Sequence, residues 1–95
     1  MGQSNSKNQK ALARIVRKPE VLITLGYSKS TLFNRIEAGL CPPSISLGGR
    51  AVGWLESEIQ TVLSAHVSGM SQDDIKELVT KLVKDRTAKG STFNG

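Results

Sequence analysis

Residue types that support catalysis or covalent cross-linking are scarce in this sequence of 95 residues. It contains one cysteine, Cys41, and one histidine, His66. A single cysteine cannot form an internal disulfide, and these two residues supply too few ligands for a zinc site. Catalytic triad, cysteine–histidine, paired-carboxylate and phosphate-loop patterns are also missing. The composition therefore predicts a protein that is not an enzyme and needs no metal or other cofactor.

Long apolar segments are lacking too. Apolar residues make up 38% of the chain, and aromatic residues 4%. No run approaches the roughly 20 residues that span a bilayer, and none resembles the apolar core of a signal peptide. We expect one small domain with a cytoplasmic location and no membrane partner.

Acidic residues are rare in the first half of the chain. Residues 1–50 carry eight lysine and arginine residues against two glutamates, a net charge of +6, whereas residues 51–95 carry five basic and six acidic residues, a net charge of −1. Such an asymmetry favours a polyanionic partner for the N-terminal half.

What the first half does contain is a capped helix between two glycines. Gly26 can end a preceding helix, Ser28 is placed to cap the next one, and Gly39 to end it. At 100° per residue, Leu32, Phe33 and Ile36 fall within an arc of about 100°. The opposite side carries mostly small, hydrogen-bonding or cationic side chains. They belong to Ser30, Thr31, Asn34, Arg35 and Ala38. Such a face suits a DNA major groove, although it also suits plain solvation.

The neighbouring segments complete a winged helix-turn-helix pattern. Pro19 can start a short helix that ends at Gly26, and residues 15–16 can form a very short strand. Residues 44–47 and 50–54 flank the pair Gly48-Gly49, which is typical of a hairpin turn. We therefore expect a two-stranded wing with Arg50 just after its tip.

Two further helices follow. The first, from Leu55 to about Val67, is predicted to close the core, and Ser71 is predicted to cap the second. The second helix carries an apolar stripe of Ile75, Leu78, Val79, Leu82 and Val83. This stripe either packs on the same core or forms an interface with a second copy or another protein.

The predicted organisation has four parts. Residues 1–13 form a disordered arm, 14–68 the DNA-binding domain, 71–86 an amphipathic helix and 87–95 a disordered tail. The fold class is mainly α with a small two-stranded β wing.

Residues 17–63 resemble the AlpA-like prophage regulators and excisionases, within the MerR-type winged helix group. Residues 26–36 look like the family's G-x-S-x-S-T-[LI]-[YF]-x-x-[IM] run, and residues 47–54 look like its L-G-x-R-x-V-x-W wing. One departure is Cys41-Pro42-Pro43-Ser44, where the family has F-P-x-P. We expect Leu40 or Trp54 to fill the space that the aromatic ring would occupy.

The resemblance implies a sequence-specific DNA-binding protein of a mobile element, bacterial and associated with the nucleoid when bound. It would act as a transcriptional regulator or as an excision directionality factor. The DNA contacts we predict are Arg17, Lys18, Tyr27, Ser28, Lys29, Ser30, Thr31, Asn34, Arg35 and Arg50. Lys18 and Lys29 could instead be merely solvated, and Arg50 could pair with Glu56 or Glu58. The alternative function is an interaction module that modulates an integrase or a regulator without binding DNA.

Overall fold

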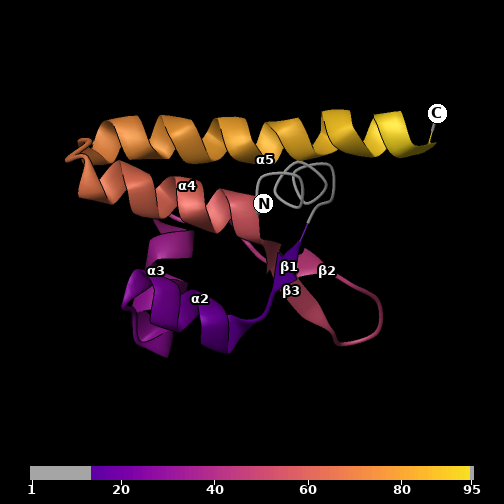
Figure 1. The fold of residues 1–95 in the computed structure, drawn as a ribbon, viewed down its shortest axis with the longest axis horizontal. Coiled ribbons are helices and arrows are strands. Elements are labelled where there is room, and N and C mark those ends of the chain that lie inside the picture. The colour runs from indigo at the N-terminus through magenta and orange to yellow at the C-terminus, as the bar shows by residue number, and fades with distance from the viewer. Residues whose placement is uncertain (1–13, 95) are drawn as a thin grey trace, which may run out of the picture.

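A computed structural model describes residues 14–94, with side chains described for residues 14–86. The elements in chain order are β1 (Ile15–Val16), α2 (Lys18–Leu25), α3 (Lys29–Glu37), β2 (Ile45–Ser46), β3 (Val52–Leu55), α4 (Glu56–Val67) and α5 (Gln72–Asn94). Helices α2 and α3 lie together on one side of α4, and the three strands lie beside them (Figure 1). Helix α5 runs along α4 on the side away from α2. The predicted fold class, mainly helical with a small β wing, is confirmed.

Helices α2 and α3 begin and end at the predicted residues. Pro19 lies in the first turn of α2, where its missing N–H costs nothing. The Ser28 hydroxyl caps α3 by accepting a hydrogen bond from the Thr31 N–H. Gly26 and Gly39 follow α2 and α3 with φ angles of 69° and 79°, in the left-handed region that favours glycine.

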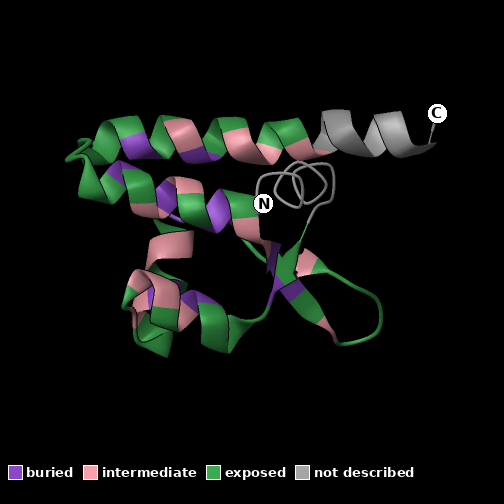
Figure 2. Cartoon of the chain, in the orientation of Figure 1, coloured by how far each residue is buried: buried purple, intermediate pink, exposed green. Residues whose placement is uncertain are grey.

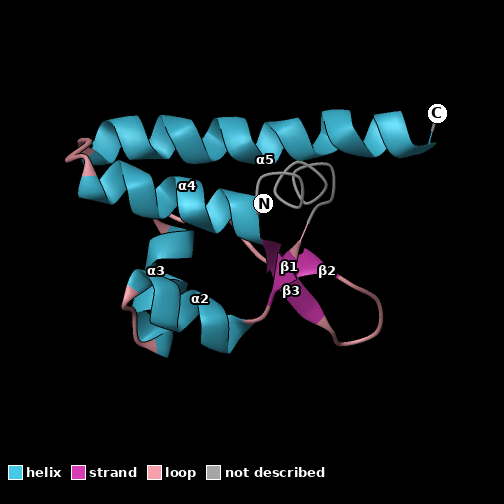
Figure 3. Cartoon of the chain, viewed as in Figure 1, coloured by secondary structure: helices cyan, strands magenta, loops and turns pink. Residues whose placement is uncertain are grey.

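The wing contains one strand more than the predicted pair. Strands β2 and β3 form the expected antiparallel hairpin, and β1 pairs with the other edge of β3, so the strand order is β1-β3-β2. Figure 3 shows the three strands beside the start of α4. Gly53 lies at the centre of this sheet, where an added Cβ would approach Ile15 Cγ2 to 2.6 Å. Only glycine therefore allows β1 to lie this close to β3.

Two buried clusters meet on α4. One joins the wing to α2 and α3, and it consists of Val16, Val21, Leu32, Cys41, Trp54 and Ile59. The other joins α4 to α5, and it consists of Leu40, Val62, Ala65, Ile75 and Val79. Figure 2 shows buried residues along α4 and on the parts of its neighbours that face it. The core is thus organised around α4 rather than around α3.

The apolar stripe of α5 packs inside the chain. Ile75 and Val79 are buried, and Leu78, Leu82 and Val83 are partly buried against the same cluster. Ser71 caps this helix, because its hydroxyl accepts a hydrogen bond from the Asp74 N–H at 3.1 Å. Within the chain, the stripe thus packs on the core.

Helix α5 extends beyond its predicted end at residue 86. We predicted a disordered tail from Thr87, but α5 continues to Asn94. The segment contains no proline, and the single Gly90 costs about 1 kcal/mol in a helix without ending it. The predicted disordered arm, residues 1–13, lies outside the described residues.

Candidate nucleic-acid interface

Helix α3 presents its polar side to solvent because its apolar side is held in the core. Leu32 is buried and Ile36 is partly buried, and both belong to the cluster around Trp54. After the helix, the Gly39 N–H donates to the Ile36 carbonyl at 3.1 Å and the Leu40 N–H to the Arg35 carbonyl at 2.8 Å. This pair of bonds is a Schellman motif. It stops the helix sharply at Gly39.

The exposed face of α3 is hollowed near its C-terminal half. The hollow has a volume of about 360 Å³, and it is lined by Thr31, Asn34, Arg35, Ala38 and Leu40. Three of these residues are predicted DNA contacts, so the structure brings them together on one surface. The hollow offers an amide, a hydroxyl and a guanidinium, and all three can donate hydrogen bonds to base edges or phosphates.

Tyr27 helps to orient Arg35. The Arg35 guanidinium carbon lies 5.7 Å from the centroid of the Tyr27 ring, a distance at which a cation and an aromatic ring attract. The Tyr27 hydroxyl lies 3.4 Å from His66 Nε2 at the end of α4. Burial raises the pKa of this hydroxyl, and the neighbouring Arg35 only partly opposes the effect. Tyr27 therefore stays neutral and serves as a support for the arginine.

The start of α3 favours an anion. Its first turn contains no acidic residue, and Lys29 is its first residue and exposed. The Ser28 hydroxyl donates to the Thr31 hydroxyl at 2.9 Å and lies 3.4 Å from the Ser30 hydroxyl. These bonds hold the hydroxyls at the start of the helix, where its dipole is positive.

The wing tip exposes Arg50. The turn is closed by hydrogen bonds from the Leu47 N–H to the Ala51 carbonyl and from the Ala51 N–H to the Gly48 carbonyl, at 2.8 and 3.0 Å. The alternative partners that we considered for Arg50 are engaged elsewhere: Glu56 pairs with Arg14 and Glu58 with Arg86. Pairing of Arg50 with either glutamate was therefore the wrong alternative.

Two predicted contacts lie at the start of α2. Arg17 caps this helix without a side-chain hydrogen bond, and Lys18 is its first residue. Both are exposed. They precede Val21, which is buried in the same core cluster as Leu32 of α3.

The comparisons with known proteins agree with this arrangement. The family described as Prophage CP4-57 regulatory protein (AlpA) matches residues 14–66, more than half of the chain. The chain belongs to the AlpA family of prophage regulatory proteins. A relative, the uncharacterized protein ORF88 of Enterobacteria phage P4, is 41% identical over 56 residues, which is 59% of this chain and 64% of that protein. The match therefore spans less than two thirds of the relative's length. No solved structure matches the chain.

The AlpA match covers the sheet, α2, α3 and most of α4, and it ends before α5. The resemblance drawn from the motifs is confirmed, and the family is one of regulators. No described helix is both long and apolar enough to cross a membrane.

Sequence reasoning missed one exposed residue of the AlpA helix-turn-helix. We placed Phe33 on the apolar arc of α3, yet its side chain is 63% exposed. The core accepts only Leu32 and Ile36, and Phe33 lies at the border, three residues from Ser30 and four from Glu37. That spacing is the signal in the sequence, since both neighbours are polar and exposed.

Proposed function

We propose that this protein binds a specific site on double-stranded DNA and so regulates transcription or excision of a prophage. Helix α3 would enter the major groove, and the wing would contact the adjacent minor groove or phosphates. The observation that carries this proposal is the exposed hollow of Thr31, Asn34 and Arg35 on α3. Its position in the basic half of an AlpA-family chain supports the assignment.

Each part of the surface has a distinct task in this proposal. Asn34 can pair with adenine and Arg35 with guanine in the major groove. Lys29 and the free N–H groups at the start of α3 suit a phosphate, as do Arg17 and Lys18 on α2. Tyr27 and Ser28 support these contacts from behind. Ser30 and Thr31 add hydroxyl donors beside them.

Phe33 completes the surface as its apolar element. An exposed aromatic ring on a recognition helix can contact the methyl group of thymine, which is the apolar feature of the major groove. Arg50 at the wing tip is free of Glu56 and Glu58, and it suits a narrow minor groove or a phosphate.

Binding to selected duplexes tests the proposal. The full chain is used to select sites from a random duplex pool, and affinity is then measured by fluorescence anisotropy at several salt concentrations. We expect affinity to fall steeply with salt, because bound phosphates release counterions. Arg35→Ala should lose about 1–3 kcal/mol of binding free energy. Lys84→Ala is the matched control, since it removes one exposed cation from α5 and should bind as wild type does.

The opposite result would reject the proposal. If no sequence is enriched, or if Arg35→Ala and Lys84→Ala bind alike, α3 does not read DNA. If binding is confirmed, footprinting on the DNA around any neighbouring integrase gene separates the two regulatory roles. Protected repeats beside an attachment site would indicate excision, and protection upstream of a promoter would indicate transcriptional control.

The alternative, an interaction module that modulates an integrase or a regulator without binding DNA, depended on the α5 stripe. That stripe packs on α4 within the chain, with Ile75 and Val79 buried. The side chains we had considered for a partner are therefore used in the core.

A further inference from the structure

The segment between α3 and β2 decides how the recognition helix and the wing are placed relative to each other. It contains Pro42 and Pro43 in succession. Proline has no N–H, so this stretch of backbone can be anchored by hydrogen bonds only through its carbonyl oxygens. The rigidity of the linker therefore depends on which donors bind these two carbonyl oxygens.

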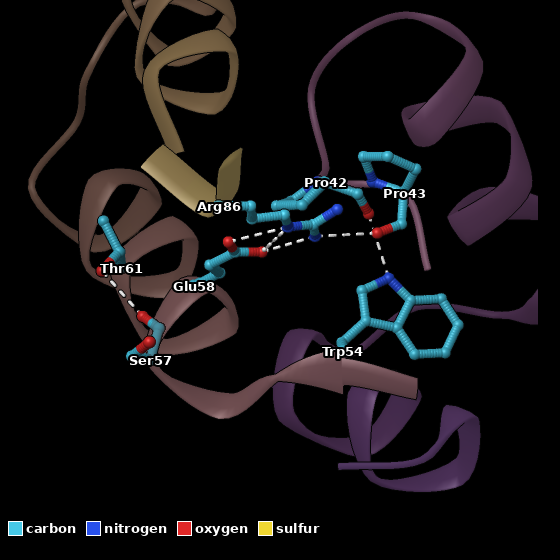
Figure 4. A network of polar contacts seen from close by, with 7 residues as sticks. All are labelled: Pro42, Pro43, Trp54, Ser57, Glu58, Thr61 and Arg86. Carbon is cyan, nitrogen blue, oxygen red and sulfur yellow. Dashed lines mark hydrogen bonds and ion pairs between the residues drawn. The ribbon is translucent and has the colours of Figure 1, made fainter. Parts of the chain in front are cut away.

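Both oxygens are bound by residues from distant parts of the chain. The Trp54 indole N–H donates to the Pro42 carbonyl at 3.0 Å in a buried position. Arg86 of α5 donates from Nη2 to the Pro43 carbonyl at 2.9 Å. Figure 4 shows the two donors approaching adjacent carbonyls of the linker. The wing thus anchors one proline, and α5 anchors the other.

Glu58 fixes Arg86 in the orientation that this bond requires. Arg86 Nη2 donates to Glu58 Oε1 at 2.6 Å, and Nε donates to Oε2 at 3.0 Å. The side chains of Arg86 and Glu58 are 18% and 4% exposed. A planar guanidinium bound along one edge by a buried carboxylate has few other orientations available. Its Nη2 is therefore held ready for the Pro43 carbonyl.

Helix α5 also contacts the start of the same linker. Leu40 is buried in a cluster with Ile75 and Val79 of α5. A Cβ on Gly39 would lie 3.9 Å from Lys76 Cγ, so α5 passes beside the end of α3. The helix therefore contacts the linker at both ends, directly after α3 and just before the wing.

We propose that α5 is a splint for the DNA-binding surface, with Arg86 as the positioning residue that fixes the wing relative to α3. The proposal deepens the DNA-binding function and its functional readout depends on it. It also assigns a role to a helix that lies beyond residues 14–66, the part matched by the AlpA family. The linker, in which cysteine and serine replace the family's phenylalanine and second proline, is the place where such support is needed.

A paired substitution separates this role from stability. Arg86→Met alone would leave the Glu58 carboxylate buried without a partner, and the chain could unfold for that reason. Glu58→Leu with Arg86→Met replaces the ion pair with apolar side chains, an exchange that often preserves or increases stability. The double variant removes the Pro43 hydrogen bond while it keeps the packing of α5 on α4. Lys84→Met is the matched control on the same helix.

Residual dipolar couplings of the amides measure the placement of the wing without DNA. In the wild type and the Lys84→Met control, the couplings of β2, β3 and α3 should fit a single alignment tensor. In the double variant, the couplings of α3 and α4 should still fit it, whereas those of β2 and β3 should shrink. Wing couplings that stay on the wild-type tensor would overturn the proposal, whatever the variant does to DNA binding.

Affinity for a duplex selected by the wild-type protein supplies the functional readout. We expect the double variant to bind about 3- to 30-fold more weakly at an unchanged melting temperature, the range expected for groups coupled through contact. Adding Arg50→Ala should then have less effect than it has in the wild type, because the wing is already misplaced. Full additivity of the two changes would count against the splint. Failure of the wild type to select any duplex would reject the DNA-binding function. The dipolar couplings would still test whether α5 fixes the wing relative to α3.

Discussion

Helices α3 and α5 begin alike, since in each a serine hydroxyl accepts a hydrogen bond from an N–H three residues on. They differ in the charge of the first turn and in the exposure of their apolar side chains. The first turn of α5 contains Asp73 and Asp74, which complement its own dipole, whereas the first turn of α3 contains no acid. The stripe of α5 faces the core throughout. Phe33 of α3 is left in solvent.

This difference distinguishes a helix that stabilises the fold from one that offers a surface. Helix α5 has satisfied its N-terminus and its apolar side within the chain. Helix α3 keeps an unneutralised N-terminus, an exposed ring and a donor-lined hollow, and none of these contributes to the core. Features that a folded chain leaves unsatisfied are the ones that a partner can use.

The largest expected effect concerns the core side of this comparison. Ile75→Ala should reduce the free energy of unfolding by about 2–5 kcal/mol, because Ile75 is 1% exposed and its loss leaves a cavity between α4 and α5. Urea denaturation followed by circular dichroism measures the change. A loss below about 0.5 kcal/mol would mean that α5 does not pack on α4 as described.

Phe33→Ala is the matched change on α3. It should alter the free energy of unfolding by no more than about 0.5 kcal/mol, because the ring is exposed. Binding to the selected duplex should weaken by about 1–2 kcal/mol if the ring contacts a thymine methyl. Replacing each thymine of the site with uracil in turn should then locate that methyl group. A destabilised protein with normal DNA binding would reverse the roles given to the two helices.

Arg50→Ala tests whether α3 acts without the wing. We expect a loss of less than about 1 kcal/mol in high salt and a larger loss in low salt, because an exposed cation acts mainly through phosphates. The slope of log affinity against log salt should fall by about 1. Anisotropy titrations at four salt concentrations give this slope. An unchanged slope would confine the interface to α2 and α3.

Cys41, which is buried directly after α3, makes stability depend on pH. Burial, with a smaller contribution from Glu58, raises the pKa of the Cys41 thiol from 9.0 to about 11. The unfolded chain therefore releases this proton first, and stability that is complete below pH 9 should decline up to about pH 11. The slope should not exceed about 1.4 kcal/mol per pH unit. Urea midpoints of the wild type and Cys41→Ala between pH 8 and 10.5 test this, since the variant should lack the added slope.

Local chemistry made much of the fold predictable. The caps at Ser28 and Ser71, the stops at Gly26 and Gly39 and the glycine turn of the wing depend on neighbours within a few residues. The stripe of α5 follows from its period, although the sequence left its partner open. The side chains lining the hollow could be named because they share one arc of α3.

Contacts between distant segments could not be predicted in the same way. Strand β1 can pair with β3 only because Gly53 leaves room for Ile15. Arg86 can donate hydrogen bonds to Glu58 and Pro43 only once α5 has folded back along α4. Phe33 was misassigned because an apolar residue beside a core position normally turns inward, and here the core was already filled by Leu32 and Ile36.

The hydrogen bond between Arg86 and Pro43 can form only late in the synthesis of the chain. The two residues are 43 positions apart in the chain. At 5–20 residues per second, a ribosome adds Arg86 roughly 2–9 s after Pro43. Throughout that interval a nascent chain holds α3 and the wing without the hydrogen bond from Arg86 to the linker between them. In the proposed role of α5, a newly made molecule acquires the arrangement of α3 and the wing only after Arg86 is synthesised, so that a chain interrupted earlier carries the family's motifs without that arrangement.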